Sequence, residues 1–401
     1  MSESSVRTGD TAPGTTPDPD RQAPQNRWAA YLPTIRTTVA AVVLALLIGA
    51  VLIIFSTPRV IQSLGYFFTY PWDFFRYAGI AVWDGYSALV QGSVGSGTSL
   101  QRTLERAAPL IAAGLGVSLA FRSGLFNIGA QGQILLGAIA AGYLGFGPSM
   151  FPGIHLLVAL VAAVLAGAFW GGIAGWLKAQ TGAHEVISTI MLNYVARFLM
   201  LYLLASEAFQ RRGSDNLLSP PVDKSAAFPQ LFSIHSGVLL AFLAALGVWW
   251  LLERSTLGFE MRAVGANPQA ARTAGMSVSR VYFTAMALAG ACSGLAAAML
   301  VLGERNSLSD NVAGSVGFDA ITVALLGRAT PLGTVLAGLL FGALSSGGLA
   351  MQAAAGVPPE LAEVLQALIV LFVAAPALVR SVFRIRVEGT TGSVEAKGWG
   401  G

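Results

Sequence analysis

Long runs of apolar residues, separated by short polar loops, make up most of the chain after residue 39. At 1.5 Å per residue, nearly all of these runs are long enough to cross a bilayer as helices. We expect ten helices, over residues 39–55, 103–121, 125–145, 154–177, 184–205, 236–252, 281–302, 318–327, 332–350 and 361–379. The run 318–327 is too short to cross fully, and transporters place unwound backbone in such spans. The pattern predicts an all-α polytopic membrane protein with partial-span helices.

Composition agrees with this class. Of the 401 residues, 54% are hydrophobic and 11% are charged, and the mean hydropathy is +0.65. The 47 glycines include small-residue pairs four apart, Gly167 with Gly171 and Gly290 with Gly294, that allow close helix contact. Cys292 is the single cysteine, so no intrachain disulfide can form. The net charge of +4 gives no case for nucleic-acid binding.

The polar ends and the first apolar run set the expected domain boundaries. Residues 1–26 are rich in Pro, Thr, Ser, Gly and Asp, which predicts a disordered cytoplasmic tail. Residues 27–55 have arginines before the apolar run and no small-x-small cleavage site, which predicts an uncleaved signal anchor. Residues 102–380 form the core, and residues 381–401 form a second cytoplasmic tail.

Residues 56–101 are unusually aromatic. Rings with Asp and Arg between them favour the headgroup level, so we expect an interfacial segment on the outer face, with a core helix pair as the alternative. The rings belong to Phe67, Phe68, Tyr70, Trp72, Phe74, Phe75, Tyr77, Trp83 and Tyr86.

Positive charges indicate the orientation. An even number of spans places both termini in the cytoplasm of a bacterial cell membrane, and basic residues should then be more frequent inside. The inner set is Arg27, Arg36, Arg122, Lys178, Arg254, Arg262, Arg272, Arg280, Arg328, Arg380, Arg384 and Arg386. The outer set is smaller: Arg59, Arg76, Arg102, Arg106, Arg211, Arg212, Lys224 and Arg305.

The sequence also contains a short internal repeat. Arg106-Ala-Ala-Pro-Leu110 matches Arg328-Ala-Thr-Pro-Leu332, on opposite faces of the membrane in this topology. Such a relation fits two inverted four-helix halves around a midplane site.

The predicted cytoplasmic loop 253–280 contains a short helix with clear end signals. Asn267 can cap it, Pro268 suits its first turn, and Gly275 suits the left-handed position after it. A helix of under two turns is unstable alone in water, so something must hold it. It is either a docking element that receives force from a soluble partner or an ordinary capped turn.

The sequence lacks the motifs of common catalytic sites. It has no G-x-x-x-x-G-K-[ST], no H-E-x-x-H and no G-x-S-x-G, and it has only three histidines. These absences argue against ATP binding in a P-loop, a structural zinc, a haem or catalysis by this chain.

One polar stripe lies inside a predicted span. Glu185, Thr189, Asn193 and Arg197 follow at intervals of four residues, along one slowly drifting helix face. A central arginine costs at least about 2.5–3.5 kcal/mol on insertion scales, so Arg197 should face a partner or a wet cavity. A carboxylate such as Asp319 is one candidate partner.

A second polar group lies where the span 125–145 begins. Phe126, Asn127 and Gln131 offer an aromatic ring and neutral amides, which suit an uncharged polar ligand with a flat ring. The alternative is hydrogen bonding between helices, at about 0.6 kcal/mol each. We favour that alternative for Gln133 and leave both open for Asn127 and Asn193.

Four stretches resemble a known family: RAAPLIAAGLGVSLAFRSGLFNIGAQGQ, HEVISTIMLNYVA, LGFEMRAVGANPQAARTAG and GFDAITVALLGRATPLG. Together they resemble, from about Leu100 to Pro376, the permease subunits of bacterial ABC importers for nucleosides, simple sugars and branched-chain amino acids, most of all the nucleoside branch. The resemblance implies a ten-helix permease that pairs with a second permease. It also implies a separate ATPase that holds ATP and Mg²⁺, and a lipid-anchored binding protein that delivers substrate from outside.

The resemblance also gives roles to residues. The loop matching Arg262–Gly275 would be the coupling helix that seats in a groove of the ATPase, with Ala271 and Gly275 allowing close contact and Arg262 and Arg272 meeting acidic residues. Gly265, Asn267 and Pro268 belong to the same loop. Two departures are Gln131, where many relatives have Glu, and Arg197, where an apolar residue is common.

We therefore expect a nucleoside importer permease that works by alternating access, surrounded by membrane lipid and without a cofactor of its own. Its substrate pathway would include Phe126, Asn127, Gln131, Thr189, Asn193 and Arg197. The alternatives are a simple-sugar permease, a proton-coupled secondary transporter that uses Glu185 and Arg197, and a scaffold that transports nothing.

Overall fold

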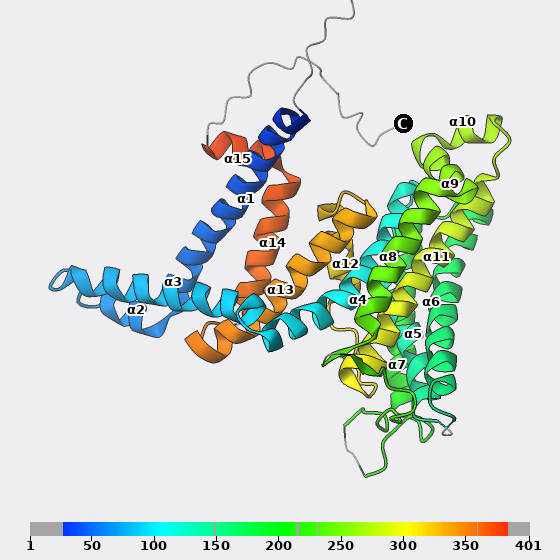
Figure 1. The fold of residues 1–401 in the computed structure, drawn as a ribbon, viewed down its shortest axis with the longest axis horizontal. Helices are drawn as coiled ribbons and strands as arrows, with labels where there is room; N and C mark the ends of the chain where they lie inside the picture. The colour runs from blue at the N-terminus through cyan, green and yellow to red at the C-terminus, as the bar shows by residue number, and fades with distance from the viewer. Residues whose placement is uncertain (1–26, 148–149, 214–215, 232, 359, 384–401) are drawn as a thin grey trace, which may run out of the picture.

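The computed structural model describes residues 27–147, 150–213, 216–231, 233–358 and 360–383, and the two predicted tails lie outside this part except for residues 381–383. The described chain is mainly helical (Figure 1). Its elements are α1 (Arg27–Ser56), α2 (Pro58–Leu64), α3 (Pro71–Val94), α4 (Gly97–Arg122), α5 (Ala130–Gly145), α6 (Ile154–Thr181), α7 (Glu185–Leu204), β1 (Gln230–Leu231), β2 (Ile234–His235), α8 (Gly237–Arg254), α9 (Thr256–Ala266), α10 (Pro268–Thr273), α11 (Val278–Ala298), the π-helix η1 (Met299–Arg305), α12 (Val316–Leu326), α13 (Pro331–Ala355), α14 (Glu360–Ala374) and α15 (Pro376–Phe383).

Each of the ten predicted helices overlaps a helix of the structure. Within the described residues, seven helices are long and apolar enough to cross a membrane: α1, α4, α6, α7, α8, α11 with η1, and α13. The helices α5, α12 and α14 are shorter than these, with 16, 11 and 15 residues. The chain is thus a polytopic membrane protein that combines full spans with short helices.

Two of the predicted helices differ from the structure by a loop or a break. The helix expected over 125–145 begins only at Ala130, because residues 123–129 form a loop. The helix expected over 361–379 is two helices, with a break at Ala375 before Pro376. Proline has no N–H to continue the hydrogen-bond ladder of the preceding helix, which accounts for this break.

The helix α4 is the centre of the molecule. Its residues Ala107–Ala120 are buried without interruption, between α8, α11, α12 and α13. The pair α6 and α11 packs closest, since a Cβ atom on Gly167 would lie 2.3 Å from the carbonyl oxygen of Gly290. A Cβ atom on Gly294 would lie 2.2 Å from the carbonyl oxygen of Ala163. The predicted contact between small residues is confirmed for these two helices.

The aromatic segment forms the helices α2 and α3, which cross the direction of the neighbouring bundle (Figure 1). One face of α3 packs on α13, where Ser93 donates hydrogen bonds to the carbonyls of Leu89 and Ala343. Trp72 and Trp83 point outward and are 76% and 74% exposed. Such exposed rings suit a helix at the headgroup level, and that location stays a prediction.

One structural unit occurs twice. A long helix, a loop and a short helix follow one another in α4, residues 123–129 and α5, and again in α11 with η1, residues 306–315 and α12. The short helices meet at their N-terminal ends, through hydrogen bonds of Gln131 in α5 to Gly314 and Gly317.

The two short helices run in opposite directions from this meeting point. α5 ends beside the loop that follows η1, where Leu308 lies against Gly142. The turn after α12 lies beside the end of α4, where Arg122 donates a hydrogen bond of 2.8 Å to the carbonyl of Ala329. The units are therefore inverted relative to each other.

The five-residue sequence repeat does not mark this structural repeat. Arg106 and Pro109 lie inside α4, whereas Arg328 and Ala329 form a left-handed turn with φ of 52° and 49° before α13. The same residue types thus adopt two different backbone conformations, and the repeated units pair α4 with α11 instead of with α13.

Candidate functional site

The predicted polar group at the start of α5 is bonded internally. Asn127 and Gln133 face each other, with amide contacts of 3.2 and 3.3 Å in the two directions. The side-chain oxygen of Asn127 also accepts from the N–H of Gly129 at 2.9 Å. Ser293 of α11 donates to Gln133 at 3.0 Å, as the interhelical interpretation of Gln133 expects. These amides hold the loop 123–129 against α5 and α11.

Asn193 fixes the same loop from α7. Its oxygen accepts from the N–H of Gly132 at 2.8 Å, and its amide donates to the carbonyl of Ile128 at 2.9 Å. Thr189, one turn earlier, donates to the carbonyl of Glu185 at 2.7 Å. In this conformation both amides left open by the sequence, Asn127 and Asn193, have protein partners.

Gln131 joins the two short helices. Its amide donates to the carbonyl of Gly314 at 2.9 Å, and its oxygen accepts from the N–H of Gly317 at 3.0 Å. A Cβ atom on Gly317 would lie 2.4 Å from the backbone of Gln131, so only glycine fits there. Phe126 packs on Phe121, with ring centroids 5.1 Å apart.

Arg197 is separated from the rest of its predicted stripe. Each step of four residues turns a helix by about 40°, so the stripe drifts around α7. The side chain of Asn193 is buried, whereas the side chain of Arg197 is exposed. Within the described residues, the ion pairs are Lys178 with Glu185 and Glu304 with Arg305. The suggested pairing of Arg197 with Asp319 is therefore wrong.

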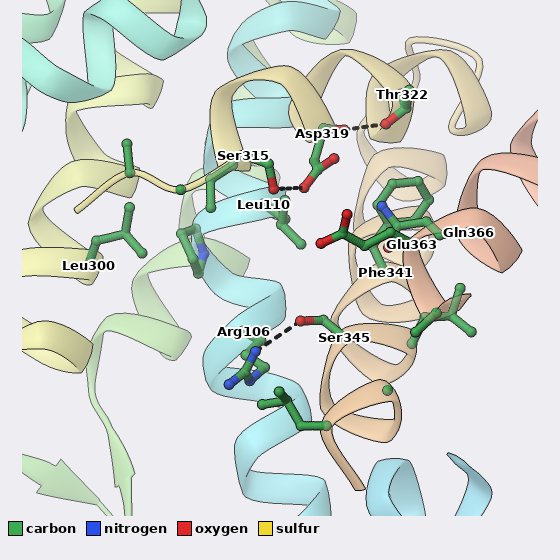
Figure 2. A pocket seen from close by; sticks show the side chains of 18 of the residues that line it. Arg106, Leu110, Leu300, Ser315, Asp319, Thr322, Phe341, Ser345, Glu363 and Gln366 are labelled. Atoms are coloured by element: carbon green, nitrogen blue, oxygen red, sulfur yellow. Dashed lines mark hydrogen bonds between the residues drawn. The ribbon is translucent and has the colours of Figure 1, made fainter. Parts of the chain in front are cut away.

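A cavity of about 400 Å³ lies between α4, η1, α12, α13 and α14. Figure 2 shows Asp319 of α12 and Glu363 of α14 pointing into the same space. The polar side chains of its wall are Arg106, Glu304, Arg305, Ser315, Asp319, Thr322, Ser345, Glu363 and Gln366.

The hydrogen bonds of the cavity wall leave its charges available. Arg106 donates to the hydroxyl of Ser345 at 2.9 Å, and Ser315 donates to the carboxylate of Asp319 at 2.7 Å (Figure 2). Asp319 and Glu363 are two carboxyl groups that line the same cavity. Phe341 adds a large apolar surface. The cavity therefore offers carboxylates, a guanidinium and an aromatic ring to a ligand.

The sequence did not point to this cavity. The charge distribution assigns Arg106 to the outer set, but it lies within α4. The sequence suggests Asp319 only as a partner for Arg197. Glu363 and Gln366, three residues apart inside a predicted span, were the available signal, because polar groups at this spacing share a helix face.

The loop between α8 and α11 has the predicted short helix α10. The side chain of Asn267 accepts from the N–H of Ala270 at 3.0 Å, and Pro268 is the first helical residue. Gly275 has a φ of 85°, the left-handed conformation expected after a helix. The predicted cap and end signals are confirmed.

Contacts with the membrane helices hold this loop. A Cβ atom on Gly265 would lie 2.2 Å from the carbonyl oxygen of Arg122, the last residue of α4. Ala271 is only 4% exposed, so its methyl group packs inward. Arg272 and Gly275 are exposed. That Ala271 and Gly275 allow close contact with a partner stays a prediction.

The segment between α7 and α8 contains a buried histidine. His235 is 2% exposed and its ring centroid lies 6.0 Å from that of Phe228. Neither ring nitrogen has a hydrogen-bond partner among the residues that the structure describes. Burial therefore lowers the pKa of His235 below its usual value. A Cβ atom on Gly303 of η1 would lie 3.0 Å from this ring, so the histidine contacts the segment that leads to α12.

Comparison with known proteins agrees with this architecture. Residues 99–374 match the family described as branched-chain amino acid transport system / permease component. The guanosine ABC transporter permease protein NupP of Bacillus subtilis is 42% identical, over 76% of this chain and 89% of the relative. The glucose ABC transporter permease protein TsgB13 of Haloferax volcanii is 38% identical, over 72% and 79%. The nucleoside ABC transporter permease protein NupB of Lactococcus lactis is 33% identical, over 73% and 83%.

Each of these three organisms also has a second similar permease with a matching name, which in Haloferax volcanii is the putative glucose ABC transporter permease protein TsgC13, 27% identical over 62% of this chain. NupQ of Bacillus subtilis is 27% identical over 60% of this chain, and NupC of Lactococcus lactis is 25% identical over 59%. No solved structure matches the chain. The matched region covers the helices that hold both the cavity and the loop around α10. The chain therefore belongs to the permease-component family of branched-chain amino acid transport systems.

Proposed function

We propose that this chain is the membrane-spanning subunit of an ATP-driven importer and that it takes up nucleosides by alternating access. The observation that carries the proposal is the 42% identity to a guanosine permease over 76% of the chain. The polar cavity beside α12 also supports the proposal. Its side chains suit a polar substrate, and its volume lies in the usual range of ligand pockets, about 300–1,000 Å³.

The chemistry of the cavity suits a nucleoside. Asp319 and Glu363 accept hydrogen bonds from ribose hydroxyls, and such bonds to charged groups are the stronger kind. Gln366 and Ser345 both donate and accept, so they match the edge of a base. Phe341 provides a ring for base contact.

A simple sugar is the second candidate substrate. The glucose permease of Haloferax volcanii is 38% identical to this chain, and carboxylates bind sugar hydroxyls as readily as those of ribose. Gln366, Ser345 and Phe341, which are assigned to the base, would distinguish a nucleoside from a simple sugar, because a sugar has no base.

The residues first assigned to the pathway have a supporting role in this proposal. Asn127, Gln131 and Asn193 hold the starts of α5 and α12, where the two inverted units meet, while Phe126 packs on Phe121 and Thr189 bonds within α7. We propose that they set the distance between the units during the transport cycle. A direct contact with substrate in another conformation stays a prediction.

We propose that a separate ATP-binding subunit, which holds ATP and Mg²⁺, seats on the loop around α10. Arg272 and Gly275 offer the exposed contact surface, and Asn267 with Pro268 keeps the helix formed. The start of α1 and α15 lie at the same edge of the molecule as α10 (Figure 1), which supports the proposal that both ends of the described chain face the cytoplasm. An extracytoplasmic lipoprotein would deliver substrate to the opposite side.

The contacts of the loop provide a path for coupling. Force on α10 reaches Gly265, which abuts the carbonyl of Arg122 at the end of α4. Arg122 in turn donates to Ala329, in the turn after α12. Movement of the loop therefore acts on both inverted units, which is what opening one side and closing the other requires.

Reconstitution tests the proposal. The permease, its second permease and its ATPase are placed in liposomes with the binding protein, and uptake of labelled guanosine, uridine, ribose, glucose and leucine is measured. We expect ATP-dependent accumulation of guanosine and uridine, and none by this chain alone. Accumulation of sugars alone would replace the substrate assignment. Uptake by this chain alone that an ionophore collapses would indicate a secondary transporter.

A further inference from the structure

A second hollow of the molecule lies where α8 leads into α9 and α10 (Figure 1). The last turn of α8, the end of α4 and the start of α13 surround a groove of about 530 Å³. Its lining residues are Arg122, Trp249, Glu253, Arg254, Thr330, Pro331 and Leu332. Among the described residues, the groove and the cavity beside α12 have no lining residue in common, so they are separate sites.

The groove contains two cations and one anion. Arg122 is held in place, because its Nε donates a hydrogen bond of 2.8 Å to the carbonyl of Ala329. Glu253 and Arg254 are exposed neighbours at the end of α8. In the part of the chain that the structure describes, none of the three charged side chains forms an ion pair. The groove therefore offers a ligand two guanidinium groups and a carboxylate.

The uncharged polar groups of the groove are already used by the fold. Thr330 donates a hydrogen bond of 2.8 Å to the carbonyl of Gly327, and its oxygen accepts from the N–H of Gly333 at 3.2 Å. Pro331 has no N–H to donate. Recognition of a polar ligand in this groove therefore depends on the three charged side chains.

The groove continues into the apolar surface of two spanning helices that pack together, α8 and α13. At the groove, Trp249 is 43% exposed and Leu332 is 72% exposed. One turn further along the same helix faces, Leu246 of α8 and Leu336 of α13 are both 59% exposed. A tryptophan between charged and apolar surface is typical of the membrane–water interface. The site thus joins a charged end to an apolar surface, as a phospholipid does.

We propose that this groove binds one phospholipid whose headgroup carries a phosphodiester and a primary ammonium, as in phosphatidylethanolamine. Arg122 and Arg254 hold the phosphate, since guanidinium groups donate charge-assisted hydrogen bonds to phosphate oxygens. The carboxylate of Glu253 accepts hydrogen bonds from the ammonium, which the ring of Trp249 also attracts. The acyl chains lie along the apolar faces of α8 and α13. Binding at this site does not depend on which substrate is transported.

The mixture of charges selects this headgroup. Phosphatidylglycerol satisfies the arginines but gives Glu253 no cation and places a negative phosphate beside it. Phosphatidylcholine has a cation without an N–H, so it donates no hydrogen bond to the carboxylate. An acidic segment of a soluble partner would suit the arginines, but it would leave Leu332 and Leu336 without an apolar neighbour.

Native mass spectrometry tests the phosphate contact. The whole transporter is stripped of lipid in detergent and titrated with phosphatidylethanolamine, phosphatidylglycerol or phosphatidylcholine that have the same acyl chains. We expect phosphatidylethanolamine to bind one site at least tenfold more tightly than the other two lipids. R254Q should weaken this binding at least tenfold, whereas R280Q, at an exposed arginine at the start of α11, should not. Equal affinity in R254Q and the natural chain would overturn the proposal.

A second variant tests the ammonium contact. In E253Q the preference for phosphatidylethanolamine over phosphatidylglycerol should disappear, because the neutral amide neither attracts the ammonium nor repels an anion. E207Q, at an exposed glutamate after α7, is the matched control and should keep the preference. An unchanged preference in E253Q would refute the role of the carboxylate. Thermal unfolding of each variant without added lipid identifies a folding defect.

Two further measurements identify the source of the headgroup. A ligand that binds only the folded chain raises its melting temperature, so phosphatidylethanolamine should raise it in the natural chain and not in R254Q. An equal rise with soluble phosphoethanolamine would show that the site takes a free phosphate compound instead of a lipid. Benzoylphenylalanine in place of Leu332 should give lipid adducts on illumination in native membranes. Cross-links to the ATP-binding subunit in their place would assign the groove to that partner and overturn the proposal.

Discussion

The starts of α5 and α12 occupy related positions in two inverted units, yet they differ in how their polar groups are used. At α5, Asn127 and Gln133 bond each other, and Asn193 bonds the backbone around them. At α12, Ser315 and Asp319 face a cavity of about 400 Å³. One helix start is closed by internal hydrogen bonds and the other is open to a ligand.

The comparison separates residues that hold the fold from residues that can bind. A buried amide with all its partners in the protein stabilises a conformation, and its loss leaves other groups unsatisfied. A carboxylate at a cavity keeps lone pairs free for a ligand. Substitutions at α5 should therefore change stability, whereas those at α12 should change transport.

The contact between the two helix starts should be the most sensitive point. In G317A the added methyl would lie 2.4 Å from the backbone of Gln131, so the two units must separate. We expect at least a hundredfold loss of uptake and a stability loss of about 1–3 kcal/mol, typical of overpacking. Uptake in liposomes and thermal unfolding measure these effects. The control is G247A in α8, where no atom lies within 4 Å, and equal loss in both variants would contradict the prediction.

The next largest effect is expected from substitutions in the cavity beside α12. D319N and E363Q remove the charges from the cavity and keep its shape. Because hydrogen bonds to charged groups contribute about 1.5–3 kcal/mol, we expect uptake efficiency to fall tenfold to a hundredfold. The melting temperature should change little. Normal guanosine uptake by both variants would remove the cavity from the substrate path.

At the start of α5 we expect the reverse, a loss of stability without a change in substrate preference. In N127A the amide of Gln133 and the N–H of Gly129 lose a partner. A buried group left without a partner costs about 1–3 kcal/mol, so the melting temperature should fall. The ratio of guanosine to uridine uptake should stay the same. A changed ratio with an unchanged melting temperature would show instead that Asn127 contacts substrate.

The smallest expected effect concerns pH on the α12 side. Burial lowers the pKa of His235, so below the ordinary histidine pKa of about 6.5 the unfolded chain binds more protons than the folded one. Stability should therefore decrease as the pH falls below about 6.5, by at most about 1.4 kcal/mol per unit of pKa difference. Melting curves at pH 7.5 and 5.5 for the natural chain and H235F measure this. An equal decrease in both chains would assign it to other groups.

The apolar pattern by itself determined the class of fold. It located a helix at each of ten positions, and the end signals Asn267, Pro268 and Gly275 located both ends of the short helix α10. These features depend on neighbouring residues along the chain, because helix formation and capping are local. The motif resemblance gave the permease family for a similar reason, since the matching residues are contiguous.

Tertiary structure alone decided what the polar residues do. Gln131 bonds Gly314, 183 residues away, and Arg106 bonds Ser345, 239 residues away. Ala271 packs inward and Arg197 points outward because of which helices lie beside them. Hydropathy and helical spacing describe one helix at a time. The partner of a buried amide, the wall of a cavity and the face left uncovered are set only when helices far apart in the chain pack together.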